Sequence, residues 1–166
     1  MPEAEVETLV TPEMEERKGV WGSERVSYPV SESDIRKWAI AVYWGETPPR
    51  LYWDEEYAKT TKWGGIIAPQ DFNPFAWAVP TGAVRPAGAV PGQKTRKGGN
   101  VMNGGQKDTY GVPMRPGDVI TSRSRLSHWE ERQGRNGLTL FTYTETEWRN
   151  QDGELVKTRI STGIRY

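Results

Sequence analysis

Alternation of side-chain character is the feature of this sequence that most restricts its fold, and it runs from Gln106 to Tyr166. Apolar or β-branched residues alternate there with polar ones, which is the period of a half-buried strand. Two turn signals divide the stretch, at 134–137 and at 150–153, and the second contains the Asp-Gly pair typical of a hairpin. An antiparallel meander is therefore predicted, with strands at 118–129, 138–148 and 155–166.

The last predicted strand has two chemically distinct faces. One carries Val156, Thr158, Ile160, Thr162 and Ile164, and the other carries Lys157, Arg159, Ser161 and Arg165. Because successive side chains of a strand point to opposite sides of the sheet, we expect the first face to pack on a core. The second face is expected to contact water or a partner.

The first half of the chain carries helical rather than alternating patterns. Ser31 and Asp34 resemble a capping box that opens a helix over 32–43. Asp54 is a plausible N-cap for a second, short helix that the glycines at 64–65 would close. Helices first and a strand meander last indicate the α+β class, in which a sheet wraps around a helix.

The stretch 66–79 is apolar and aromatic and almost free of charge. Phe72, Phe75 and Val79 recur at helical spacing, and Pro69 suits the first turn of a helix. A buried central helix is therefore predicted, shortened or kinked by Pro74.

Length and composition limit the function classes. At 166 residues the chain predicts one domain, divided here into an N-terminal arm (1–20), with a loose helical pattern, and a domain over 21–166. Lysine plus arginine and aspartate plus glutamate number 22 each, so the basic footprint of a nucleic-acid-binding protein is missing. Without cysteine and with a single histidine, thiolate chemistry and a histidine metal cage are excluded. The polar, acidic N-terminus and the lack of a long apolar run predict a cytoplasmic protein without membrane contact.

Several residues are candidates for chemistry. Asp71 opens the predicted central helix and could act as a general base, although a helix cap explains it equally well. His128 lies mid-strand beside Trp129, where a structural role is the simpler interpretation. The eight tryptophans suit an interface or an acyl-chain tunnel as well as ordinary packing.

Residues 80–105 form a long segment rich in glycine and proline. Lys94, Arg96 and Lys97 lie just before its glycine-rich end, 98–105, whose free N–H groups could meet a phosphate or carbonyl oxygen. We expect residues 98–105, with these three basic residues, to lie at the mouth of a ligand site, with a solvated, disordered loop as the alternative.

The order of motifs resembles the MaoC-like dehydratases. The matching pieces are Tyr-x-Asp-Glu-Glu-Tyr-Ala, Gly-Gly-Ile-Ile-Ala-Pro, Gly-Gly-Gln, Met-Arg-Pro-Gly-Asp-Val-Ile and Asn-Gln-Asp-Gly-Glu-Leu-Val, spread over roughly residues 20–166. The resemblance implies a hot-dog fold, a curved antiparallel sheet around one central helix. It also implies hydration of enoyl-thioesters, or dehydration of 3-hydroxyacyl-thioesters, carried on coenzyme A or an acyl carrier protein. No other cofactor and no metal is expected.

One departure from the family pattern matters for activity. Catalytic members carry Asp-x-Asn-Pro-x-His just before the short helix, whereas this chain has no histidine between Glu46 and Asp54. Tyr52 stands nearest the histidine position, and a tyrosine with its usual pKa of about 10 is a poor base at neutral pH. Glu46 is one residue out of register with the aspartate. The sequence therefore favours the N-terminal type of half, which lacks the dyad and binds the acyl thioester beside a dyad-bearing subunit.

Two alternatives stay open: an autonomous homodimeric hydratase that uses Asp71, Glu46 or His128, and a non-catalytic thioester-binding module. A second MaoC-like subunit, or a second copy of this chain, is the expected partner, because a hot-dog sheet exposes an edge strand. The residues predicted to bind the substrate are Tyr52, Pro69, Asn73, Lys94, Arg96, Lys97, Gly104, Gly105 and Gln106.

Overall fold

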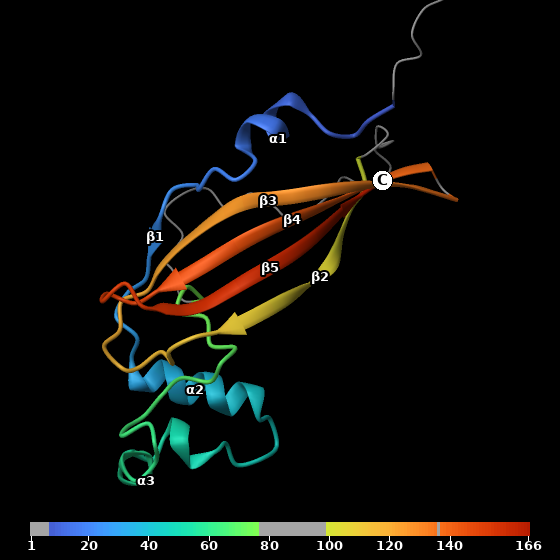
Figure 1. Ribbon diagram of the computed structural model, residues 1–166. Helices are drawn as coiled ribbons and strands as arrows, with labels where there is room; N and C mark the ends of the chain where they lie inside the picture. The colour runs from blue at the N-terminus through green and yellow to red at the C-terminus, as the bar shows by residue number, and fades with distance from the viewer. Residues whose placement is uncertain (1–6, 77–98, 136) are drawn as a thin grey trace, which may run out of the picture.

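A five-stranded antiparallel sheet dominates the computed structural model, which describes residues 7–76, 99–135 and 137–166. Its strand order is β1-β3-β4-β5-β2, so β1 and β2 are the two edge strands (Figure 1). The strands are β1 (Arg25–Val26), β2 (Val101–Tyr110), β3 (Thr121–Gly134), β4 (Gly137–Arg149) and β5 (Leu155–Arg165).

The predicted meander is present, with two shifts in its boundaries. β3 begins at Thr121 and continues to Gly134, whereas its predicted span was 118–129. β2 begins at Val101 and contains Gly104 and Gly105, which the sequence placed before the strand; this expectation was wrong. The register shifts between Asn103 and Gly105, where Gly105 has a φ of 112°, so glycine here permits an irregularity inside the strand.

The helices are α1 (Pro12–Arg17), α2 (Glu32–Val42) and α3 (Glu55–Lys59), together with the 3-10 turn η1 (Arg50–Tyr52). Ser31 caps α2 by accepting a hydrogen bond of 3.0 Å from the Asp34 backbone N–H, as the sequence predicts. Asp54 likewise accepts from the Tyr57 N–H at 3.0 Å, but α3 ends at Lys59, well before the predicted glycines. Helices α2 and α3 lie at the end of the sheet toward which β2 runs (Figure 1).

The central helix predicted over 66–79 is absent from its described part, residues 66–76, which forms extended backbone and turns. The Ala68 N–H bonds the Met114 carbonyl at 2.9 Å, which ties this segment to the chain before β3 instead of to its own next turn. Pro69 and Pro74 remove two further helix donors. Residues 77–79 lie outside the described residues.

The apolar side chains of this segment nevertheless form the core, as predicted. Phe72 and Ile35 are almost fully buried, and Trp38 meets Phe72 edge-on with ring centroids 5.5 Å apart. The core cluster joins the helical end to the sheet and comprises Val30, Ile35, Ala58, Ile66, Ala68, Phe72, Met114, Ile120, Trp148 and Val156.

Two of the motifs that carry the resemblance, Met-Arg-Pro-Gly-Asp-Val-Ile and Asn-Gln-Asp-Gly-Glu-Leu-Val, are joined by one side chain. Gln151, in the hairpin between β4 and β5, donates to Asp118 Oδ1 at 3.1 Å and accepts from the Val119 N–H at 3.0 Å. Asp118, which is buried, also accepts from the Arg115 N–H at 2.7 Å. The hairpin and the turn before β3 therefore fix each other, and Met114 in that turn reaches the core.

Candidate functional site

Two rows of side chains cross the sheet near the end of β2. Tyr110, Lys157 and Trp148 are register partners on β2, β5 and β4, and therefore lie side by side on one face. Two residues along, Asp108 pairs with Arg159 in the same way and shares that face. Tyrosine, lysine, aspartate and arginine side chains therefore meet at one place on the sheet.

Asp108 is occupied by Arg159. The guanidinium donates to both carboxylate oxygens of Asp108 at 2.7 Å, a bidentate pair. This pairing holds the pKa of Asp108 below its usual value. Tyr110 donates a long hydrogen bond of 3.4 Å to the same carboxylate, and burial, followed by the Asp108 charge, raises the pKa of Tyr110.

Lys157 is the unexpected member of the cluster, because it is 3% exposed although the sequence assigned it to the polar face of its strand. Its ammonium lies over the Trp148 ring, 4.5 Å from the centroid. Burial lowers the pKa of Lys157, and the neighbouring Arg159 lowers it further, while Asp108 and Asp71 act in the opposite direction.

A cavity of about 70 Å³ opens beside Lys157. Pro69 and Gln70 form one wall, and Tyr110 and Met114 belong to another. Gly111 lets β2 leave the sheet close to β5, because a Cβ atom at this position would overlap with the Leu155 carbonyl oxygen. The other residues that line the cavity are Gly111 and the apolar Trp63, Ile67, Ala68, Val112, Pro113 and Val156.

Of the predicted site residues, Asp71 lies near this cavity, whereas Tyr52 lines a separate one with Trp53 and Ile66. Asp71 follows Pro69 and Gln70 in an exposed turn, and its charge reaches Lys157, Tyr110 and Tyr52. Tyr52, half-buried, lies with its ring 6.3 Å from that of Tyr43. Burial, followed by Tyr43, raises the pKa of Tyr52, so its phenol stays protonated and donates hydrogen bonds at neutral pH.

The other two predicted catalytic residues lie elsewhere. His128, on β3, is exposed and stacks on Tyr143 with centroids 4.2 Å apart, while its Nδ1 is 3.2 Å from Ser127 Oγ. Glu46 is exposed in the turn after α2. The structure therefore does not bring Asp71, His128 and Glu46 together as one catalytic group.

The remaining predicted binding residues have mixed positions. Pro69 is buried and lines the cavity, whereas Asn73 is exposed and accepts from the Phe75 N–H at 3.0 Å. Gly104, Gly105 and Gln106 lie along the β2 edge. Lys94, Arg96 and Lys97 lie outside the described residues, so their role at the ligand site stays a prediction.

Sequence reasoning missed Lys157, Tyr110, Asp108 and Arg159. A usable signal was present in the Asp-Gly hairpin at 150–153, because its geometry sets the register that places Lys157 opposite Trp148. The alternation alone predicts a polar face and does not indicate that other residues bury Lys157 at one end of that face.

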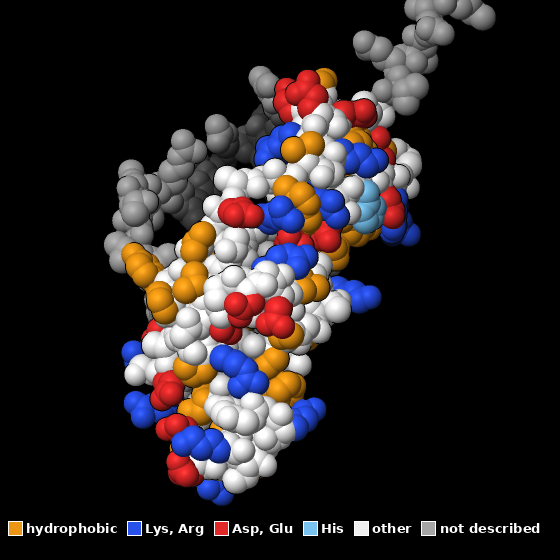
Figure 2. All heavy atoms as spheres, turned by 60° about the vertical axis from the view of Figure 1, so that its left-hand side comes forward, with side chains coloured by type: hydrophobic (Ala, Val, Ile, Leu, Met, Phe, Trp, Pro, Cys, Tyr) orange, Lys and Arg blue, Asp and Glu red, His pale blue; other side chains and the backbone are white. Residues whose placement is uncertain are grey.

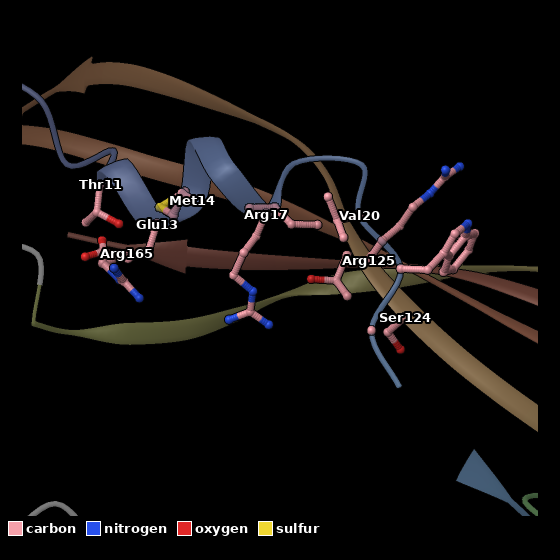
Figure 3. A pocket seen from close by; sticks show the side chains of 12 residues that line it. Thr11, Glu13, Met14, Arg17, Val20, Ser124, Arg125 and Arg165 are labelled. Atoms are coloured by element: carbon pink, nitrogen blue, oxygen red, sulfur yellow. The ribbon is translucent and has the colours of Figure 1, made fainter. Parts of the chain in front are cut away.

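A larger hollow of about 460 Å³ lies between the N-terminal arm and the sheet. Arg17 extends from α1 toward the strands, and Arg165 comes from the end of β5 (Figure 3). Arg125, also in its lining, is held by Glu145 at 2.6 Å and by the Trp21 ring at 4.4 Å. No predicted site residue lines this hollow. The contact between Trp21 and Arg125 attaches the arm to β3, and the hollow lies along this attachment.

The surface shows no large field of one sign on the visible face, where acidic and basic side chains are interspersed (Figure 2). Within the described ranges, no group of three His, Cys, Asp or Glu side chains is placed to hold a metal ion. None of the described helices is long and apolar enough to cross a membrane.

Comparison with known proteins gives consistent results. The family model described as "FAS1-like, dehydratase domain region" matches residues 17–159. A "UPF0336 protein" of Thermobifida fusca (strain YX) is 31% identical over 134 residues, which is 81% of this chain and 81% of that protein.

Solved structures with similar folds include a chain of the ChsH1-ChsH2 complex from Mycobacterium tuberculosis, with a TM-score of 0.71, 19% identity and coverage of 92% of this chain and 93% of that one. A MaoC-like dehydratase from Rhodospirillum rubrum has a TM-score of 0.56 at 17% identity, and the match covers 87% of this chain and 91% of that one. A chain of the HadBC (3R-hydroxyacyl-ACP dehydratase) complex from Mycobacterium tuberculosis has a TM-score of 0.54 at 18% identity, and the match covers 85% of this chain and 95% of that one. The predicted hot-dog fold is thereby confirmed.

Proposed function

The chain belongs to the family of FAS1-like dehydratase domains, and on this premise we propose that it is the acyl-thioester-binding subunit of an enoyl-thioester hydratase or 3-hydroxyacyl-thioester dehydratase. Its partner would be a second hot-dog subunit that carries the catalytic Asp and His. The thioester would be carried on coenzyme A or an acyl carrier protein.

The observation that carries the proposal is a mostly apolar cavity in a chain that lacks a catalytic base of the family type. The segment from Glu46 to Asp54 contains no histidine, and the tyrosine nearest that position, Tyr52, has a raised pKa. The cavity beside Lys157 is lined mostly by apolar residues, with the polar Gln70, Tyr110 and Lys157 among them, which suits an apolar ligand with a polar group.

Two further points support a subunit role. Two of the similar folds belong to complexes named for two components each, ChsH1-ChsH2 and HadBC. In this chain β2 is an edge strand that pairs with β5 on one side, and Val101 and Met102 on it are exposed. An edge of this kind is suited to pairing with another subunit, and the cytoplasm is the compartment that the sequence predicts for the pair.

The proposal is tested by assaying the purified chain alone with crotonyl-CoA and longer enoyl-CoAs, following loss of the conjugated double bond. We expect turnover at background, because no Asp/His pair is present to activate water. Robust hydration by the isolated chain would contradict the subunit role and favour an autonomous hydratase. In that case Asp71→Asn and His128→Ala would identify the base, by lowering turnover without loosening binding.

A further inference from the structure

Lys157 holds its ammonium beside the cavity rather than in a fully enclosed position. Its side chain is almost completely buried, and within the described residues its ammonium contacts the Trp148 ring but forms no ion pair. The nearest carboxylate on its face, that of Asp108, is already bound through both oxygens by Arg159.

Burying such a charge is costly. Removing an ammonium from water carries a free-energy penalty, and contact with an aromatic ring returns only part of it. The Trp148 ring therefore offsets part of the cost, and an oxygen atom close to Nζ would offset more. Because Lys157 lines the cavity, a ligand that enters there can supply this oxygen.

The local charges indicate which kind of oxygen suits the site. Lys157 and Arg159 are positive, and Asp108 and Asp71 are negative, so the four charges cancel at neutral pH. An anionic ligand would pair with Lys157 but would also meet both carboxylates. A neutral carbonyl accepts the same hydrogen bond without that repulsion, and a cavity of about 70 Å³ has room for a small group of this kind.

We propose that Lys157 donates a hydrogen bond to the thioester carbonyl oxygen of the bound acyl ligand, while Pro69, Met114 and Val156 contact its apolar part. This inference rests on the proposed function. Lys157 is then a residue that recognises the thioester group, in a position where a sequence pattern alone indicates a solvent-facing lysine.

A double-mutant cycle between protein and ligand tests the contact. Hexanoyl-CoA and S-hexyl-CoA, a thioether in which a methylene replaces the carbonyl, would be titrated calorimetrically into the wild-type chain and into Lys157→Met. We expect the wild type to bind the thioester about tenfold more tightly than the thioether, since a hydrogen bond to a charged group contributes about 1.5 kcal/mol or more. Lys157→Met should bind the two ligands equally.

Lys18→Met is the matched control, because Lys18 also places its ammonium over a tryptophan ring, that of Trp129 at 4.6 Å, but is exposed. This variant should keep the tenfold preference. Equal binding of both ligands by the wild type, or a preference that survives in Lys157→Met, overturns the inference and leaves the proposed function standing. If the wild type binds neither ligand, both proposals fail. The wild-type comparison needs no variant, so it stands even if Lys157→Met folds poorly.

Discussion

At the level of single residues, Lys157 shows how a polar side chain can be kept at a cost to stability. The charged and titratable groups that face it are Arg159, Asp108, Asp71 and Tyr110, of which Asp108 is paired with Arg159. A nearly buried charge beside a cavity is a feature for which a ligand role is a more economical explanation than a structural one.

This reasoning predicts that Lys157→Met stabilises the protein at pH 7, by about 1 kcal/mol or more, since apolar replacements of buried charges often stabilise. The lowered pKa of Lys157 adds a dependence on pH. Below its folded pKa, Lys157 is protonated in both states and destabilises by a constant amount. Between that value and the unfolded value of about 10.4, only the unfolded state holds the proton, so the free energy of unfolding rises with pH.

Urea midpoints of wild type and Lys157→Met, measured between pH 7 and pH 10, would therefore converge as the pH rises. Lys18→Met, measured in parallel, should show no such convergence, because Lys18 is exposed. A Lys157→Met variant that is less stable than wild type at pH 7 would mean that the ammonium is neutralised inside the chain, and Lys157 would then have no need of a ligand oxygen.

At the level of elements, the link between Asp118 and Gln151 holds the hairpin at the base of β4 and β5 against the turn before β3. Because Lys157 follows this hairpin closely on β5, the link also fixes the approach to the cavity. A side chain in a turn therefore helps to set the register on which the candidate site depends.

We expect Gln151→Ala to lower the free energy of unfolding by about 1–3 kcal/mol, because it leaves one oxygen of the buried Asp118 without its donor. Chemical denaturation measures this loss. Gln133→Ala, at an exposed position of β3, makes the same change in chemistry and should stay within about 0.5 kcal/mol of wild type. Equal effects of the two substitutions would show that the link does not stabilise the fold.

The elements also show what sequence could predict. The three strands of the meander, β3 to β5, followed from alternation and from the turn chemistry at 150–153, because period two and a tight hairpin leave little choice of register. Ser31 and Asp54 correctly predicted two helix starts, since their side chains satisfy the first free N–H groups. The helix predicted over 66–79 was wrong for its described part, 66–76, because apolar residues at helical spacing also arise where a turn packs Phe72 into a core.

The candidate site was predicted only in part, for a physical reason. Pro69 was identified because it belongs to a motif, and Asp71 because it stands at the start of the predicted central helix. Lys157 and Tyr110 become neighbours through strand pairing between β2 and β5, across many residues of sequence. Burial of Lys157 at one end of the polar face of β5 depends on how the segment 66–76 packs against it. The alternation of residues along β5 gives no information on that packing.

At the level of the whole molecule, this chain combines a hot-dog sheet, a mostly apolar cavity beside Lys157, and an edge strand at β2. The family relation gives the dehydratase context, while the missing histidine removes the expected base. Binding without turnover distinguishes a subunit role from an autonomous hydratase, and turnover gained with a dyad-bearing partner would distinguish it from a non-catalytic binding module.

The central claim is that the isolated chain recognises acyl thioesters, and titration calorimetry with hexanoyl-CoA and with free coenzyme A tests it most directly. We predict saturable binding of hexanoyl-CoA that is at least tenfold tighter than that of coenzyme A, because the acyl group would remove apolar surface from water at about 25 cal/mol per Å². Equal affinity for the two ligands, or no binding of hexanoyl-CoA at millimolar concentration, would contradict it.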